Sequence, residues 1–248
     1  MKTLLFYTVF IGQLFAMDLP SEMNKNEVFP VAIIVKIDGK AKILPLSSIK
    51  KHTAMAGEGL LKGDKLITYA NTKVLIKLLD ESKIVLNENA EMVLSSNALI
   101  RQERGEVYYK INKRSMSQGL RVETPFSIIG IKGTEFIVNF EGDGQIALNE
   151  GLVGITSPGE DFELFKEKEL SDFEKYQQQQ NEDFEAYKRK TEDEMAAYVK
   201  SFDLQANKML IFASSKKCKE DCEKKVVEET FSDEITASFK TYQEMVGN

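Results

Sequence analysis

Residues 124–136 read TPFSIIGIKGTEF, a stretch in which two glycines frame the corner at residues 134–136. Gly130 and Gly133 predict a backbone conformation that residues carrying a Cβ atom avoid, because glycine enters positive φ without a steric penalty. Phe136 follows the corner and begins an alternation of apolar side chains. We therefore expect Phe136 to anchor the next strand in a hydrophobic core.

Short strand-like runs extend from this stretch in both directions. They lie at residues 31–37, 40–44, 65–70, 73–79, 83–86, 91–95, 106–111, 120–124, 135–140, 145–148 and 152–156. Clusters of Asn, Asp and Gly separate them, and Asp38-Gly39 between the first two predicts a tight hairpin. Many short strands spaced about ten residues apart predict an all-β sandwich, barrel or solenoid.

Three segments of this region together resemble the FecR-like domain family: residues 59–68, residues 73–86 and residues 124–136. The last is the most specific, since it is similar to the family's Thr-Pro … Gly-(Val/Ile)-(Arg/Lys)-Gly-Thr-Glu-Phe signature. The resemblance covers residues 30–156. One departure is Glu81 where the family has Gly between its two central strands. Because Glu tolerates positive φ poorly, we expect this turn to use another geometry.

The resemblance implies a periplasmic, solenoid-like β domain that binds other proteins or envelope components and is not known for catalysis. Gly130, Gly133, Thr134, Glu135 and Phe136 then form a structural motif, in which the Glu135 carboxylate ties down nearby backbone amides. Family members that regulate sigma factors carry a cytoplasmic N-terminal segment and a full transmembrane helix. This chain shows neither, so it resembles an exported, stand-alone version.

The N-terminus points to a location outside the cytoplasm, and the charge balance argues against nucleic acid as a partner. Residues 1–17 read MKTLLFYTVFIGQLFAM, which is typical of a signal peptide with cleavage after Ala16, and we expect a periplasmic protein. The apolar run is shorter than the roughly 20 residues of a spanning helix. The formal net charge of −6 disfavours nucleic acid as the main partner.

The second half of the chain has a different composition. No glycine occurs between Gly159 and Gly247, and the last proline is Pro158. Because Gly and Pro interrupt regular helices, their absence predicts long helices. Residues 160–248 carry 14 Lys and Arg against 22 Asp and Glu. The sequence therefore predicts an acidic helical region after the β domain.

An eleven-residue repeat supports this interpretation. Its two apolar columns hold Phe162, Phe173, Phe184 and Met195 in the first and Phe165, Tyr176, Tyr187 and Tyr198 in the second, with matches again at Phe239 and Tyr242. Eleven residues make nearly three helical turns, so both columns follow one stripe. This stripe predicts a helix about 75 Å long at 1.5 Å per residue. So narrow a stripe stabilises a lone helix poorly, so we expect a partner.

Several partners fit the stripe. The helical arm could associate with a second copy, pair with a C-terminal helix as a hairpin, pack on the β domain or bind another protein. The acidic balance and a polar face of mixed sign disfavour direct binding to lipid. Envelope proteins or cell-wall polymer are the expected partners of the β domain.

The sequence offers little for catalysis or metal binding. His52 is the only histidine, and Cys218 and Cys222 are the only cysteines. The cysteines can form an intrachain disulfide if they flank a turn, remain free or pair between molecules, or bind a metal. The disulfide is preferred in an oxidising compartment. We find no catalytic motif and expect neither an enzyme nor a cofactor or metal.

Together these observations predict an α+β protein with three parts: a signal peptide at residues 1–16, a FecR-like β domain at residues 27–158 and a helical arm at residues 160–248. The leading hypothesis for function is a non-enzymatic envelope binding or scaffold protein, with the arm used for assembly. The alternative is a periplasmic sensor that relays an extracellular signal through a membrane partner.

Overall fold

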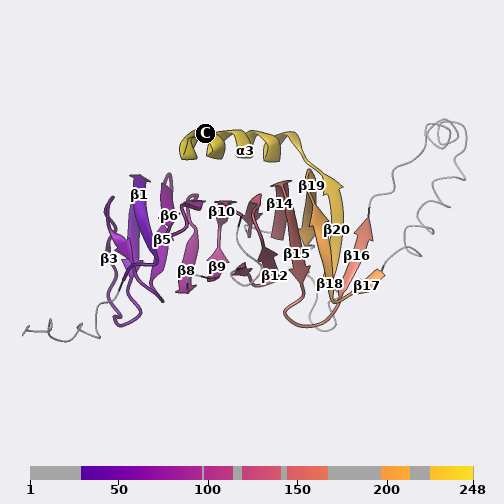
Figure 1. Ribbon diagram of the computed structural model, residues 1–248, viewed down its shortest axis with the longest axis horizontal. Coiled ribbons are helices and arrows are strands. Elements are labelled where there is room, and N and C mark those ends of the chain that lie inside the picture. Colours follow the sequence, from indigo (N-terminus) through magenta and orange to yellow (C-terminus); the bar gives the residue numbers. More distant parts are fainter. Residues whose placement is uncertain are drawn as a thin grey trace, which may run out of the picture.

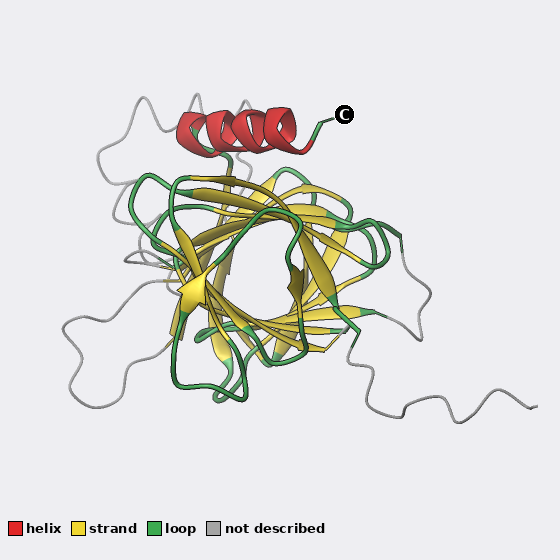
Figure 2. Ribbon diagram, turned by 90° about the vertical axis from the view of Figure 1, so that its left-hand side faces the viewer, coloured by secondary structure: helices red, strands yellow, loops and turns green. Residues whose placement is uncertain are grey.

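The computed structural model describes residues 29–96, 98–113, 119–140, 144–166, 197–212 and 224–247. These residues form two large β-sheets that face each other, with the C-terminal helix α3 (Asp233–Val246) outside one of them (Figures 1 and 2). Figure 1 shows the strands following one another along the long axis, roughly in chain order. The described part of the chain is thus an elongated, two-layered β structure.

The first sheet has eleven strands. In spatial order they are β17 (Ala197–Val199), β16 (Phe162–Lys166), β20 (Lys224–Thr230), β19 (Lys208–Phe212), β14 (Gly144–Glu150), β13 (Glu135–Asn139), β10 (Glu106–Lys110), β7 (Lys83–Leu86), β6 (Lys73–Leu78), β1 (Ala32–Asp38) and β4 (Gly59–Leu60). Neighbours pair antiparallel except β16 and β20, which are parallel.

The second sheet has nine strands. In spatial order they are β18 (Ser201–Gln205), β15 (Leu152–Thr156), β12 (Ile128–Ile131), β11 (Leu120–Glu123), β9 (Leu99–Arg104), β8 (Glu91–Ser96), β5 (Lys65–Thr68), β2 (Ala41–Leu44) and β3 (His52–Thr53). Only β9 and β11 pair in parallel in this sheet.

The main core lies between the two sheets. Strand alternation sends one side chain in two inward, so that in β10 Val107 and Tyr109 enter the core while Tyr108 points to the outer face. Phe136 is fully buried and stacks on Tyr109 with ring centroids 4.7 Å apart. The strand that follows the TPFSIIGIKGTEF stretch is therefore anchored by this aromatic pair.

The prediction of an α+β fold with a long helical arm is wrong. After Pro158 the described residues continue as strands, β16 to β20, and α3 is the one helix in the described ranges. These strands extend both sheets, since β18 pairs with β15 and β19 pairs with β14. Stripe positions 167–196 lie outside the described residues.

Apolar and polar side chains alternate around Phe162, and this local pattern is the physical reason that these segments form strands instead of a helix. Phe162 and Leu164 alternate with polar neighbours and enter the core, and Phe162 contacts the rings of Phe202 and Phe212 edge-on. Asn207 adopts φ 62° between β18 and β19. Asn207 therefore adopts the positive φ of a tight turn, a conformation for which glycine is the usual residue.

The predicted hairpin at Asp38-Gly39 is also wrong, although both flanking strands exist. β1 pairs with β6 in the first sheet, whereas β2 pairs with β5 in the second. The corner carries the chain from one sheet to the other. Gly39 has φ 105°, and a Cβ there would lie 2.6 Å from the Asn71 carbonyl oxygen, so glycine is required.

The expectation that the turn between β6 and β7 avoids positive φ at Glu81 is wrong. Glu81 does adopt the left-handed conformation, with φ 66°, at the position where the family has glycine. The turn is held by Asp80, whose carboxylate accepts hydrogen bonds from the Ser82 amide and hydroxyl at 3.1 and 2.9 Å. Lys77 also pairs with Glu81 at 3.0 Å. Neighbouring side chains thus stabilise an unfavourable backbone conformation.

We predict that Glu81→Gly raises the free energy of unfolding by about 0.5–1 kcal/mol, because glycine adopts this φ without strain. The exposed ion pair with Lys77 contributes little, so its loss should not cancel the gain. Urea denaturation measures the change. Glu81→Ala is the control: it removes the ion pair and keeps the strain, and should not stabilise. Equal effects of Gly and Ala would contradict the prediction.

Among the described residues, no helix is both long and apolar enough to cross a membrane.

Candidate interaction site

The outer face of the eleven-stranded sheet carries an apolar band where an exposed sheet would carry polar residues. Its members come from six strands and point away from the main core: Leu75, Val85, Tyr108, Ile137, Ala147 and Met209. The helix α3 covers this band, and Figure 2 shows the helix lying across the outside of the sheet. The band and the helix form a second, smaller core.

Helix α3 begins and faces the sheet for reasons that are visible in its sequence. The Ser232 side chain caps the helix by accepting a hydrogen bond from the Ile235 amide, and acidic residues occupy the first turn. Its buried residues are Ile235, Phe239, Tyr242 and Val246, which are spaced three or four apart. A 14-residue helix is marginal alone, so contact with the sheet stabilises it.

Aromatic rings form the centre of this contact. Tyr108 stacks on Tyr242 with centroids 5.2 Å apart and meets Phe239 edge-on at 6.3 Å. Phe231, just before the helix, stacks on Phe239 at 5.4 Å. Lys73 lies 5.4 Å from the centroid of the Tyr242 ring. These rings fix both the position of the helix and its rotation about its axis.

Polar groups surround the rings. The Tyr242 hydroxyl donates to the Glu106 carboxylate, and the Gln243 amide donates to Glu135 Oε1 at 2.7 Å. At the C-terminal end of the helix, Lys83 Nζ donates to the Val246 carbonyl oxygen at 2.6 Å. Such a contact satisfies a carbonyl that the helix itself leaves unpaired. The helix is therefore held along its length.

Glu135 has a structural role that differs from the one expected. Its Oε1 accepts hydrogen bonds from the Tyr108 hydroxyl at 2.9 Å and from Gln243 on α3, side chains instead of local backbone amides. Burial, together with the neighbouring Glu135 carboxylate, raises the pKa of Tyr108 far above its ordinary value. Glu135 thus joins the sheet to the helix through two neutral donors.

The structure distinguishes the two glycines of the family motif. Gly133 has φ 127°, and a Cβ there would lie 2.8 Å from the Lys113 Cα atom. Gly130 lies within β12 opposite Gly154, and a Cβ there would meet nothing closer than the Gly154 carbonyl oxygen at 3.8 Å. Thr134 is buried, and its backbone pairs with Ile111 in both directions. Only Gly133 needs to be glycine for steric reasons.

The stripe residues from Phe162 to Tyr198 that the structure describes lie in strands and not on a helix. Phe162 is in the main core, while Phe165 and Tyr198 belong to the strands β16 and β17. The other stripe residues, and also both cysteines of the predicted disulfide, lie outside the described residues: Phe173, Tyr176, Phe184, Tyr187, Met195, Cys218 and Cys222. Residues 1–16, the predicted signal peptide, lie outside them too.

The sequence reasoning missed the residues that hold α3. Glu106, Tyr108 and Lys83 lie in strands that the sequence predicts, but nothing in the sequence shows which element covers the outer face. The matches at Phe239 and Tyr242 were the available signal, because both are buried on one face of a real helix. Their spacing of three predicts that helix face by itself.

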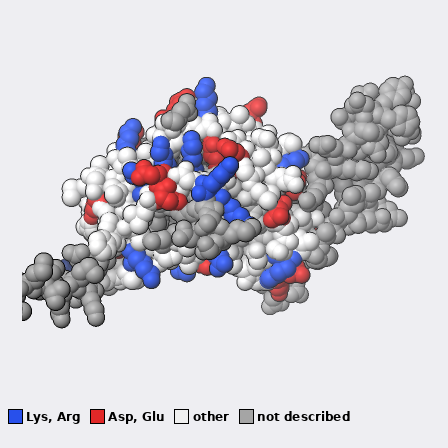
Figure 3. Space-filling model, viewed as in Figure 1, with Lys and Arg blue, Asp and Glu red and all other residues white. Residues whose placement is uncertain are grey.

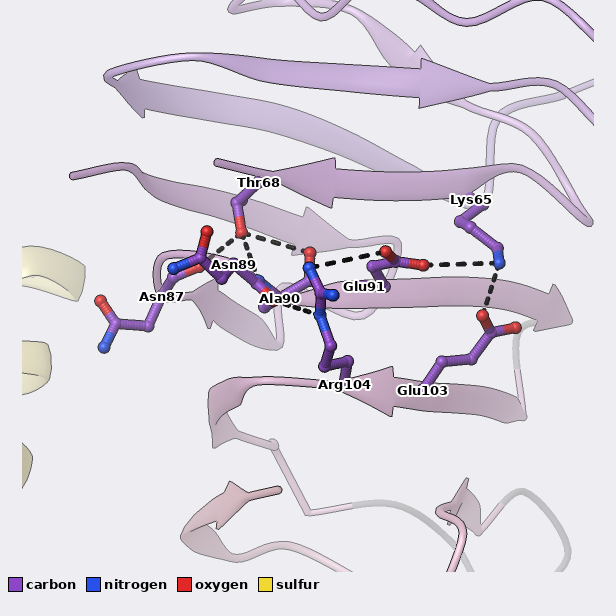
Figure 4. A network of polar contacts seen from close by, with 8 residues as sticks. All are labelled: Lys65, Thr68, Asn87, Asn89, Ala90, Glu91, Glu103 and Arg104. Carbon is purple, nitrogen blue, oxygen red and sulfur yellow. Dashed lines mark hydrogen bonds and ion pairs between the residues drawn. The ribbon is translucent and has the colours of Figure 1, made fainter. Parts of the chain in front are cut away.

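The nine-stranded sheet carries a network of charged residues on its outer face (Figure 4). Lys65 Nζ lies 2.5 Å from Glu103 and 3.6 Å from Glu91, and Arg104 lies 3.8 Å from Glu91. The hydrogen bond to Glu103 is the main reason that the pKa of Lys65 is raised. Within the described ranges, no group of three or more His, Cys, Asp or Glu side chains could hold a metal ion.

The raised pKa values of Tyr108 and Lys65 predict that the protein becomes less stable at alkaline pH. The pKa of Tyr108 is raised, so above its ordinary value of 10.0 the unfolded chain ionises while the folded chain does not. The raised pKa of Lys65 acts in the same direction above 10.5. We expect the urea midpoint to fall above pH 10, and to fall less steeply in Tyr108→Phe. A midpoint unchanged up to pH 11 would contradict this.

Comparison with known proteins supports the family resemblance. Residues 64–154 match the family model described as "FecR protein", which is consistent with a FecR-like domain in this part of the chain. The matched segment extends from the start of β5 into β15. A comparison with curated proteins gave no match.

Two solved structures show a weaker likeness. Both are crystal structures described as "a putative anti-sigma factor" from Parabacteroides distasonis. Their TM-scores are 0.46 and 0.45, at 10% and 11% identity. The alignments cover 71% of this chain, and the chain spans 64% and 63% of the length of those chains. These values are too low to establish a shared fold.

Proposed function

We propose that the FecR-like domain at residues 64–154 makes this chain a non-enzymatic regulatory protein, which relays an extracellular signal through a membrane partner. The match to the FecR family is the observation that carries the proposal. The family is regulatory, and its β domains act by binding other proteins.

The arrangement of polar side chains fits this role. Gln102, Tyr108, Tyr109 and Glu135 are buried polar side chains that hydrogen-bond to one another or to the backbone, as expected of groups with a structural role. Charges of both signs are mixed over the face shown in Figure 3, without the single-sign patch expected for a phosphate-rich ligand. A protein partner suits such a surface.

The proposal includes export. We propose that residues 1–16, whose sequence is typical of a signal peptide, direct export and so place the β domain outside the cytoplasm, where the signal would originate. Cell fractionation followed by N-terminal sequencing tests this part. A chain that keeps Met1 in the cytoplasm would contradict it.

In-cell photo-crosslinking tests the relay. A photoreactive amino acid is placed at Val35 on the eleven-stranded sheet, or at Leu152 on the nine-stranded sheet, both of which are exposed. We expect at least one position to capture a membrane-spanning protein, and deletion of either protein to change the same set of transcripts. Capture of soluble proteins alone, or transcript changes that do not overlap, would contradict the proposal.

A further inference from the structure

The apolar outer face of the eleven-stranded sheet continues beyond the helix that covers it. Figure 1 shows that α3 runs from the later strands toward the N-terminal end of the sheet, and that β1 lies beyond its C-terminus. The register places Lys83 of β7, Lys77 of β6 and Ile33 of β1 in one row. Lys83 contacts the C-terminal end of α3. Ile33 lies two strands beyond Lys83, and so beyond the end of the helix.

Large apolar side chains are exposed at this end of the sheet. Ile33 is 39% exposed, Val35 is 47% exposed, and Leu79 in the turn after β6 is 61% exposed. Ala32 and Ile34 point into the main core, so Ile33 points outward by alternation. Val35 is the extra residue of a bulge in β1, between Ile34 and Lys36. We call this region the β1 shoulder, defined by Ile33, Val35, Leu79, Lys36, Lys73 and Lys77.

The charged groups on and around the shoulder carry a small excess of positive charge. Lys36, Lys73 and Lys77 lie on the same face, opposed by Asp38, which pairs across from Lys73, and by Glu81, which binds Lys77. A surface with an apolar centre and a basic rim is complementary to a helix that has an apolar stripe flanked by acidic residues.

We propose that the β1 shoulder binds an acidic amphipathic helix of the partner protein, in line with α3. Helix α3 demonstrates that this sheet face accepts a helix lying across its strands, with apolar residues three or four apart. The shoulder continues that interface and is open, so the partner helix binds without displacing α3. This inference rests on the proposed function and names the partner's chemistry.

A defined peptide tests the shoulder on the full chain. The probe is a fluorescein-labelled helix of about 18 residues, or five turns, with Leu on one stripe and Glu on the flanks. Its counterpart has Lys in place of Glu. We expect the acidic peptide to bind the wild-type chain, with an affinity that falls as salt rises, and the basic peptide to bind about tenfold more weakly or not at all.

Substitutions locate the binding. The double variant Ile33→Ser/Val35→Ser should bind the acidic peptide about tenfold more weakly than the wild-type chain. The double variant Lys36→Glu/Lys77→Glu should show a similar loss of affinity. Leu152→Ser, at an exposed position on the other sheet, is the matched control and should change nothing. These substitutions replace exposed side chains, apart from the half-buried Lys77, so urea midpoints should confirm folding. No binding, equal binding of both peptides, or equal binding by all variants would overturn the inference.

This test is separate from the test of the relay. If crosslinks to a membrane-spanning protein arise at Leu152 and not at Val35, the relay stands and the shoulder is wrong. If no membrane-spanning protein is captured, the relay is wrong whatever the peptide does.

Discussion

Replacing Gly133 by alanine should lower the free energy of unfolding by about 3 kcal/mol or more. The residue has φ 127°, which L-residues rarely adopt, and such strain costs about 1–3 kcal/mol. The new Cβ would also lie 2.8 Å from both the Cα and Cγ atoms of Lys113. Because a backbone atom is involved, a side-chain movement cannot relieve the contact. Urea denaturation measures the loss.

Gly130 provides the matched control within the same motif. Gly130→Ala should be neutral or stabilise by about 0.5–1 kcal/mol, since the strand has room and alanine restricts the unfolded chain. The contrast between two glycines three residues apart separates a steric requirement from general sensitivity of the segment. Similar losses in both variants would show that the conformation at Gly133 is not the reason.

Replacing Gln102 should produce the second large effect, because this residue joins the two sheets through the core. Its amide nitrogen donates to the Val138 carbonyl oxygen at 3.0 Å and to that of Gly105 at 2.9 Å. Its amide oxygen accepts from the Tyr109 hydroxyl at 2.9 Å. Gln102→Leu removes the hydrogen-bond partner of the buried Tyr109 hydroxyl and a donor to two carbonyl oxygens, and we expect a loss of about 3 kcal/mol.

A double-mutant cycle with Tyr109→Phe isolates the interaction. Tyr109→Phe alone should cost about 1–2 kcal/mol, because it leaves the Gln102 oxygen unpaired in the core. Together the two changes should cost less than the sum by about 1 kcal/mol, since the double variant leaves neither partner unsatisfied. Additive losses, measured by urea denaturation, would show that the hydrogen bond between them contributes nothing.

Much of the first sheet and part of the second could be predicted from the sequence, because strand alternation there is strong. The runs around Val74, Ile84 and Phe136 are strands, and Phe136 is in the core as expected. The partners of each strand could not be predicted in the same way. At Asp38-Gly39 the sequence is typical of a hairpin, but only packing determines that β1 and β2 belong to different sheets.

The prediction for the second half is wrong for a physical reason. The absence of glycine and proline favours long helices, but Asn207 makes a tight turn at φ 62° without glycine. The eleven-residue repeat also obscured the period-two alternation around Phe162 and Leu164. Burial on a sheet, which no helical pattern reveals, decides the structure of these segments.

The interaction site shows the same limit. Phe239 and Tyr242 could be recognised as one helix face, whereas Glu106, Glu135 and Lys83 gain their roles only when the helix packs on the sheet. Contacts between residues more than a hundred positions apart leave no local pattern in a single sequence.

The described residues beyond Gly159 continue both sheets, and α3 packs on the outer face of the eleven-stranded sheet. Amide hydrogen exchange of the full chain tests this most directly, because β19 lies between β14 and β20 just as β13 lies between β10 and β14. We predict that amides of β19 exchange as slowly as those of β13. We also predict that amides of β10, whose Tyr108 side chain packs against α3, stay protected. Rapid exchange throughout β19 and α3, with β13 still protected, would contradict the account.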